Sequence, residues 1–419
     1  MSAGKFYIIL LLIALLAAAV RVYGITQQPA TADEIEMAFT AQNYLERGIF
    51  LPTMPHHPNL RNLLLSLSMS LFGTGALGVR GFSLLFGTAC APLLGLLLYR
   101  LTSNSYASVL AALLLAIDPV QITYSRQAIQ EVHTEFFTLA AVLVIIAYMK
   151  DGALKRRLWL LPVAGIIFGL ALASKAHAFF PLIVCLFYAF RAGIKEKQYD
   201  AAILSVLSMT FLPFTVFLLT DALWFLRGYD LGEWFFMRHA LAQVMAVKFV
   251  GPAMETLVDT RAWEWFIIPL RDYSSFAVLD GRSYVTLGPG NPFVWLLVLP
   301  SAAYVVFSAI RRRTDMIIPA LFIASYIPLV FARRPIFFLS ALAVAPYAYC
   351  LVGLAASDMA RSSAGRKVIY GWLAAVVIAG VLLYPLSIGR TMDYEYLAKL
   401  TERHNPHLHP ETLNFNKYR

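Results

Sequence analysis

Long runs of apolar residues, separated by short polar segments, recur along almost the whole chain of 419 residues. An α-helix needs about 20 apolar residues to cross a lipid bilayer. The pattern predicts eleven such helices, and therefore an all-α polytopic membrane protein. Their expected ranges are 6–20, 81–99, 106–122, 132–149, 158–174, 176–190, 200–219, 292–310, 315–331, 335–355 and 368–388.

Two apolar runs are shorter than a normal span. The run 6–20 follows a single lysine, so it fits either a cleaved signal peptide or a retained first helix, and we favour the retained helix because an anchor is needed there. The run Leu63–Phe72 is too short to cross a bilayer about 30 Å thick. We expect it to lie at the membrane interface.

Clusters of Lys and Arg fix the expected orientation, since such residues concentrate in cytoplasmic loops. With Lys5 in the cytoplasm, every strong basic loop falls on that same side. If Leu63–Phe72 crossed the membrane, all later loops would change sides and this agreement would be lost. The basic residues concerned are Arg100, Lys150, Lys155, Arg156, Arg157, Arg191, Lys195, Lys197, Arg311, Arg312, Arg313, Arg361, Arg366 and Lys367.

Composition supports the same class. Hydrophobic residues make up 59% of the chain, whose mean hydropathy is +0.67, which no soluble core could hide. The net charge of +10 is explained by cytoplasmic loops, so we expect no nucleic-acid partner. Cys90, Cys185 and Cys350 lie in apolar runs and are interpreted as small core residues.

The chain divides by side and position. Residues 1–220 are expected to form an N-terminal transmembrane module with an external loop at 23–80. Residues 221–291 form a second external loop, whose tryptophans suit amphipathic helices at the interface. Residues 292–388 return as transmembrane helices, and 389–419 form an external tail.

Charges outside the cytoplasmic loops are the candidates for chemistry, because an ionisable group near the apolar layer is costly. All are predicted at the external surface: Asp33, Glu34, Arg126, Glu131, Lys175, His177, Arg333 and Arg334. A carboxylate there can act as a general base, and cations can stabilise a phosphate leaving group. Their less specific interpretations are solvated loop acids and interfacial Arg anchors.

The tail carries His404, His407 and His409, which resemble a metal cluster but lack an acid or Cys partner at suitable spacing. No Walker motif, dinucleotide glycine motif or His-Glu-x-x-His motif is present.

Five segments, in order, resemble the protein O-mannosyltransferases. They are TADEIEMAFTAQNYLERGIFLPTMPHHPNLRNLLLSL, DPVQITYSRQAIQEVHTEFFTLA, GLALASKAHAFFPLIV, LGPGNPFVWLLVLP and RRPIFFLSALAVAPYAYCL. Together they are similar to the GT-C glycosyltransferase superfamily, in its mannosyltransferase and lipid A aminoarabinose transferase branch. Departures are Asn59 for a Pro, Arg61 and Asn62 for Gly-Lys, and Ser340 near a Tyr.

The resemblance implies a GT-C bundle and an inverting transferase that takes a sugar from a polyprenyl phosphate at the outer face of a plasma membrane. It implies that Asp33 is the general base and that Glu34 supports it at the catalytic site. Arg126, Lys175, Arg333 and Arg334 would hold the donor phosphate, while Glu131, His57 and Asn291 would support the site. A divalent metal shared by Asp33 and Glu131 is left open, as is pairing of two chains.

Two other classes are weighed. A transporter or flippase for a lipid-linked or anionic solute would place charges near the bilayer midplane and show two matched halves, which this chain lacks. A silent scaffold subunit would bind donor and give no product. The sugar and the acceptor, whether protein Ser/Thr, lipid or glycan, are not defined by the sequence.

Overall fold

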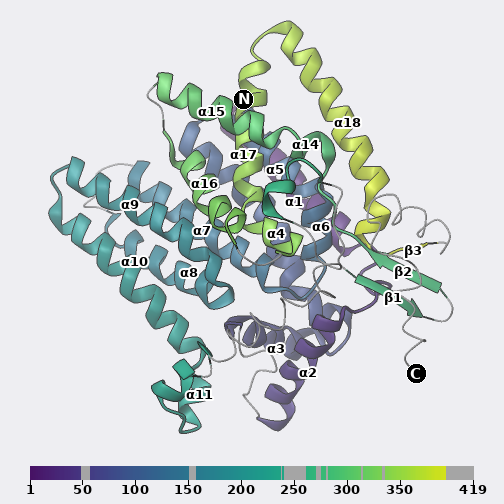
Figure 1. The fold of residues 1–419 in the computed structure, drawn as a ribbon. Helices are drawn as coiled ribbons and strands as arrows, with labels where there is room; N and C mark the ends of the chain where they lie inside the picture. The colour runs from purple at the N-terminus through teal and green to yellow at the C-terminus, as the bar shows by residue number, and fades with distance from the viewer. Residues whose placement is uncertain are drawn as a thin grey trace.

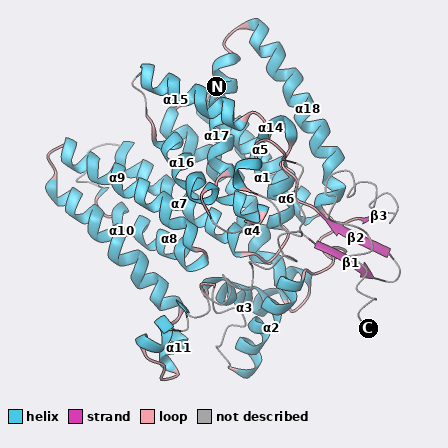
Figure 2. Cartoon of the chain, in the orientation of Figure 1, coloured by secondary structure: helices cyan, strands magenta, loops and turns pink. Residues whose placement is uncertain are grey.

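The computed structural model describes residues 1–48, 57–150, 157–236, 238–239, 261–269, 275–279, 282–312, 315–332 and 336–392. Helices make up most of this part of the chain, and Figure 2 shows strands at one corner only. The predicted helical membrane-protein class is confirmed.

The elements follow one another as a long series of helices with one small sheet. The helices are α1 (Ala3–Val22), α2 (Ala32–Arg47), α3 (Leu60–Phe72), α4 (Ala76–Thr102), α5 (Ser105–Ile117), α6 (Pro119–Ser125), α7 (Gln130–Lys150), α8 (Leu160–Ser174), α9 (Phe179–Lys195), α10 (Tyr199–Thr220), α11 (Ala222–Leu226), α14 (Pro292–Trp295), α15 (Val298–Arg312), α16 (Ile317–Val330), α17 (Ala345–Met359) and α18 (Ser363–Ser387). Short 3₁₀ segments are η2 (Ala176–Ala178), η3 (Ala262–Glu264) and η4 (Phe338–Ala343), and the strands are β1 (Ser275–Leu279), β2 (Arg282–Thr286) and β3 (Thr391–Met392).

Seven helical segments in the described ranges are long and apolar enough to cross a membrane. They correspond to the predicted runs at 6–20, 81–99, 132–149, 176–190, 200–219, 292–310 and 368–388. The bent pair α5 and α6 raises the number to eight. Helices α8 and α16 are shorter apolar helices, so the predicted count of eleven stays a prediction.

The bend between α5 and α6 measures 55° and has a local cause. Pro119 stands at the first position of α6 and has no N–H to continue the helix above it. Asp118 caps the new helix, accepting a hydrogen bond from Val120 N at 3.0 Å, and its other oxygen accepts from Trp295 Nε1 at 2.9 Å. The predicted span 106–122 is therefore two helices joined by a buried, capped carboxylate.

Loops predicted to share the cytoplasmic side contact one another. Lys150, after α7, pairs with Asp315 at 2.9 Å. Arg312 and Arg361 both pair with Asp358, at 3.0 and 2.8 Å. Figure 1 shows α2, α3 and α11 at the end of the bundle opposite the N-terminus. This arrangement supports the predicted orientation.

One hydrophobic core runs through most of the bundle, and small residues let its helices approach closely. A Cβ atom on Gly165 of α8 would lie 2.1 Å from the carbonyl oxygen of Ser208 in α10. A Cβ on Gly87 of α4 would lie 2.2 Å from the Cβ of Ser125 in α6. Such contacts are typical of membrane helices, where packing rather than water exclusion joins neighbours.

Helices α2 and α3 pack on each other at the external end (Figure 1). Met37 and Ala41, one turn apart on α2, form an apolar cluster with Leu65 and Met69 of α3. Apolar Ile35 and Phe39 on another face of α2 are more than half exposed, at 62% and 54%. The expected interfacial position of the run beginning at Leu63 fits this packing, because both helices lie beside the bundle and present apolar surface.

The second external loop contains an element that the sequence did not predict. We expected an external loop with interfacial helices over 221–291, and β1 and β2 also form an antiparallel hairpin there, with β3 paired to β2. The strand sequences SFAVL and RSYVT are rich in β-branched and aromatic residues, which favour strands. The division of the chain into four regions stays a prediction.

Cys90, Cys185 and Cys350 are buried and free, which confirms them as core residues.

Candidate active site

The first external helix starts with a reciprocal cap. Thr31 Oγ1 accepts a hydrogen bond from Glu34 N at 3.1 Å, and Glu34 Oε2 accepts one from Thr31 N at 2.9 Å. This capping box satisfies two N–H groups that a helix start leaves free. It also fixes the directions in which Asp33 and Glu34 leave the helix.

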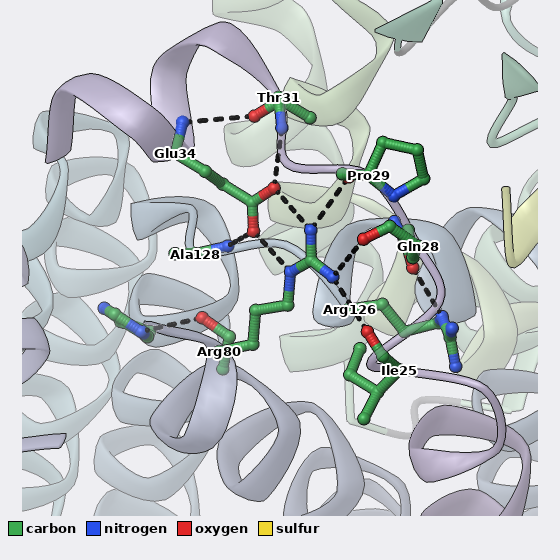
Figure 3. Close-up of polar contacts among 10 residues, drawn as sticks. Ile25, Gln28, Pro29, Thr31, Glu34, Arg80, Arg126 and Ala128 are labelled. Carbon is green, nitrogen blue, oxygen red and sulfur yellow. Dashed lines mark hydrogen bonds and ion pairs between the residues drawn. The ribbon is translucent and has the colours of Figure 1, made fainter. Parts of the chain in front are cut away.

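Glu34 is held from every side (Figure 3). Its two oxygens accept hydrogen bonds from Arg80 at 2.7 and 2.9 Å, and Ala128 N donates a further one at 3.1 Å. The same guanidinium donates to the carbonyls of Ile25, Gln28 and Pro29. Glu34 thereby ties α2, the start of α4 and the turn before α7 into one buried cluster.

Arg126 lies next to this cluster and donates hydrogen bonds to three acceptors of the protein itself. It is fully buried and donates to Gln28 Oε1 at 2.9 Å and to the carbonyls of Arg21 and Tyr23 at 2.6 and 2.7 Å. Figure 3 shows Arg126 beside Gln28, whose side-chain oxygen accepts the hydrogen bond. No described residue is a hydrogen-bond partner of the buried Arg126 Nη2, so this nitrogen is left for another ligand. Its role at the phosphate stays a prediction.

Asp33, the next residue before Glu34, is exposed. Partial loss of hydration among surrounding protein atoms raises the pKa of this carboxyl above its usual range, and the nearby acids Glu131, Glu36 and Glu34 raise it further, whereas Arg61 lowers it. A raised pKa makes a carboxylate a better proton acceptor. Asp33 is thus exposed at the surface, and its raised pKa favours accepting a proton.

Glu131 and Lys175 form an ion pair across the external ends of α7 and α8. The Glu131 side chain is only 2% exposed, and no described residue hydrogen-bonds to its second oxygen, which is buried. The Lys175 side chain is 20% exposed, so it is less deeply buried than its partner. The predicted phosphate ligand is therefore held in place by the predicted supporting acid.

Arg61, near the start of α3, contacts the start of α7. It is 1% exposed, and it donates to Gln130 Oε1 at 3.0 Å and to Asn62 Oδ1 at 3.1 and 3.2 Å. Burial lowers its pKa to about 10, opposed by Glu131 and Asp33, so it stays protonated at neutral pH. Arg61 therefore supplies positive charge that acts on both Glu131 and Asp33.

The remaining predicted residues differ in position. Asn291 is fully buried, caps α14 through Phe293 N and donates to the Val376 carbonyl at 2.9 Å. His57 contributes its backbone oxygen to a hydrogen bond from Arg238. Arg333 and Arg334 lie outside the described residues, as do His404, His407 and His409. Among the described residues, no group of three His, Cys, Asp or Glu is placed to hold a metal ion.

Two buried arginines and their contacts were not predicted from the sequence. Arg80 was not among the candidates, although an arginine near the start of an apolar helix is costly and usually has a partner. Arg21 was also missed. Arg21 lies in the last turn of α1 and is fully buried. It donates to Ser125 Oγ at 2.8 Å and to the Ala116 carbonyl at 2.9 Å. The Thr-x-x-Glu pattern at Thr31 was readable as a capping box and would have indicated that Glu34 is committed to the backbone.

The architecture matches solved membrane glycosyltransferases of GT-C type. The S. cerevisiae protein O-mannosyltransferase Pmt1-Pmt2 complex bound to the sugar donor superposes with a TM-score of 0.80, over 96% of this chain and 92% of that one, at 13% identity. ArnT from Cupriavidus metallidurans bound to undecaprenyl phosphate gives 0.59, over 92% and 66%, at 17% identity. The chain therefore has the GT-C fold.

Comparison of the sequence with known proteins indicates which branch of the GT-C glycosyltransferases the chain resembles. The family model described as dolichyl-phosphate-mannose-protein mannosyltransferase matches residues 74–258. A polyprenol-phosphate-mannose–protein mannosyltransferase of Mycobacterium tuberculosis is 22% identical over 412 aligned residues, covering 80% of this chain and 77% of that protein. The predicted resemblance to the GT-C mannosyltransferase branch is confirmed.

Proposed function

We propose that this chain is an inverting glycosyltransferase that moves a sugar, a mannose-like hexose, from a polyprenyl phosphate to a hydroxyl acceptor at the external membrane face. The observation that carries the proposal is Asp33, an exposed carboxylate near the start of α2. Figure 1 shows α2 at the end of the bundle opposite the N-terminus, which we predict to be the external end. The donor class comes from the similar proteins, one of them a polyprenol-phosphate-mannose–protein mannosyltransferase and another a structure bound to undecaprenyl phosphate.

The proposed reaction is a single displacement. Asp33 takes the proton of the acceptor hydroxyl while its oxygen forms a bond to the anomeric carbon. The bond from that carbon to the phosphate oxygen breaks, and polyprenyl phosphate leaves with the bonding electrons. One displacement inverts the anomeric centre.

The leaving phosphate needs cations. Lys175 is a candidate because its side chain is partly exposed, and Arg126 is another because no described residue pairs with its buried Nη2. Arg333 and Arg334 remain candidates by resemblance. A donor phosphate would compete with Glu131 for Lys175. We propose that Glu34 acts through the fold, by holding α2 and hence Asp33 in place.

The test is transfer by the purified protein in liposomes, with polyprenyl-phosphate-linked labelled mannose and Ser/Thr peptides. We expect labelled peptide with the lipid-linked sugar, none with the nucleotide-linked sugar, and none with the Asp33→Asn variant. Lipids and glycans replace peptides in parallel reactions. Movement of label across the membrane with no covalent product from any acceptor would favour the flippase class instead.

A further inference from the structure

A small cavity lies beneath the Glu131–Lys175 pair, among α7, η2, η4 and α17. Its volume is about 10 Å³, which is roughly the least space that holds one water molecule. Besides Thr134, four polar side chains line it: Glu135, Thr138, His177 and Tyr347. Because Glu135 follows Glu131 by four residues on α7, the cavity lies about one helical turn deeper than the pair.

Each of these four side chains has a buried polar atom without a hydrogen-bond partner in the described structure. The atoms are Glu135 Oε2, Thr138 Oγ1, His177 Nε2 and Tyr347 Oη. Glu135, Thr138 and Tyr347 are themselves only 3%, 6% and 1% exposed. Unpartnered buried polar atoms are uncommon, and four around one space indicate a missing ligand.

We propose that this cavity binds one hydroxyl-sized group, which bridges Glu135, Thr138, His177 and Tyr347. Such a group both donates and accepts, as the mixed lining requires: the carboxylate oxygen accepts, while the hydroxyls do either. A buried water typically makes about three hydrogen bonds, and this space offers four. The oxygen comes either from water or from a hydroxyl of the bound sugar donor.

The neighbouring contacts favour one fixed oxygen over open solvent. Glu135 Oε1 already accepts from Gln121 Nε2 at 3.0 Å, whereas Oε2 has no partner among the described residues. Thr134, also in the lining, is satisfied by donating to the Gln130 carbonyl at 2.9 Å. The bridge would therefore join α7, which carries Glu131, to η2 through His177 and to α17 through Tyr347.

The experiment measures the melting temperature of Thr138→Val and Tyr347→Phe, first without donor. Both changes remove a hydroxyl at nearly constant shape. If water occupies the site, each variant loses a hydrogen bond and melts about 1–3 °C lower. If the site is dry, each loses only an unpaired polar atom and melts at the same or a higher temperature.

Two matched controls set the scale. Tyr326→Phe removes a hydroxyl that donates to the Ala262 carbonyl at 3.0 Å, so it should lower the melting temperature. Ser325→Ala removes a buried hydroxyl without a partner outside this cavity, so it should not. An experimental density map supplies an independent readout, as a peak about 2.7–3.2 Å from at least three of the four atoms.

A second arm adds polyprenyl-phosphate mannose and rests on the proposed function. If the sugar supplies the hydroxyl, the variants keep their donor-free melting temperature but show a smaller rise with donor than the unsubstituted chain. The inference is overturned if neither variant melts lower without donor, both show the full rise with donor, and the density is empty. Absence of any rise in the unsubstituted chain would count against the proposed donor and leave the water arm intact.

Discussion

Two acids next to each other in the sequence, Asp33 and Glu34, have opposite surroundings. Glu34 is 1% exposed and paired with Arg80, and its carboxylate accepts hydrogen bonds from two backbone N–H groups, Thr31 N at its own helix start and Ala128 N. Asp33 is exposed, and of the four charged groups that shift its pKa three are acids and one is Arg61. One acid of the pair is thus held inside the fold, and the other is the one that we propose for the chemistry.

Helix geometry explains this division. Successive side chains on an α-helix point about 100° apart, so neighbours cannot share a face. The capping box holds the Glu34 carboxylate at the helix start, where it is buried, whereas Asp33, on a different face of the helix, is exposed. A motif of two adjacent acids at a helix start therefore indicates one buried anchor and one accessible group.

The largest expected effect is on catalysis. Asp33→Asn keeps shape and loses the basic oxygen, so transfer should fall by about 10²–10⁴-fold. Its free energy of unfolding should stay within about 0.5 kcal/mol of the unsubstituted chain, because the side chain is exposed. Rates and melting curves on the same preparation check both statements, and an active Asp33→Asn enzyme would remove the general-base assignment.

Next in size is the stability of the anchor. Glu34→Ala leaves Arg80 buried without its carboxylate, which should cost about 3–5 kcal/mol of unfolding free energy. Glu36→Ala, on the same helix and only partly buried, is the matched control and should cost about 0.5 kcal/mol or less. Equal melting temperatures for the two variants would show that the Glu34–Arg80 pair is not a structural anchor.

A smaller effect is expected at Lys175. Lys175→Met removes a phosphate ligand, so the KM for donor should rise roughly tenfold with less change in kcat. Glu131→Gln frees Lys175 from its ion pair and should leave that KM unchanged or lower it. If both variants raise the KM equally, the pair acts as a unit in structure rather than through the phosphate.

The smallest effect is a shift in pH dependence. A general base works when deprotonated, so activity is lost as the pH falls through the pKa of Asp33. Arg61 lowers that pKa, and Arg61→Met should therefore move the acid limb of the rate profile to higher pH. Arg61→Lys keeps the charge and should move it less. An unmoved limb in Arg61→Met would separate Arg61 from Asp33.

The bundle was largely predictable because apolar runs report burial in lipid directly. The run 81–99 became α4, and the basic clusters near Lys150 and Arg312 came together as expected. The strands at 275–286 were not foreseen, since short alternating segments between aromatic residues also suit an interfacial helix.

The sequence indicated the charged residues of the candidate site, whose roles stay predictions, but it did not indicate their partners. Sequence identified Asp33, Glu34, Arg126, Glu131 and Lys175 as external charges. It did not reveal that Arg80 lies against Glu34, because such long-range pairing depends on how α4 packs beside α2. Charge and position along a chain indicate that a group is unusual, whereas the partner decides whether it is structural or reactive.

The central claim is the division between Asp33 and Glu34, and it is tested by the activity per folded molecule of Glu34→Gln at low temperature. The folded fraction is counted from the melting curve, and the transfer rate is divided by it. We expect a rate per folded molecule within about threefold of the unsubstituted chain, because a change of that size is under 1 kcal/mol in activation free energy. A rate lowered about a hundredfold or more in fully folded protein would place Glu34 in the chemistry and contradict the division.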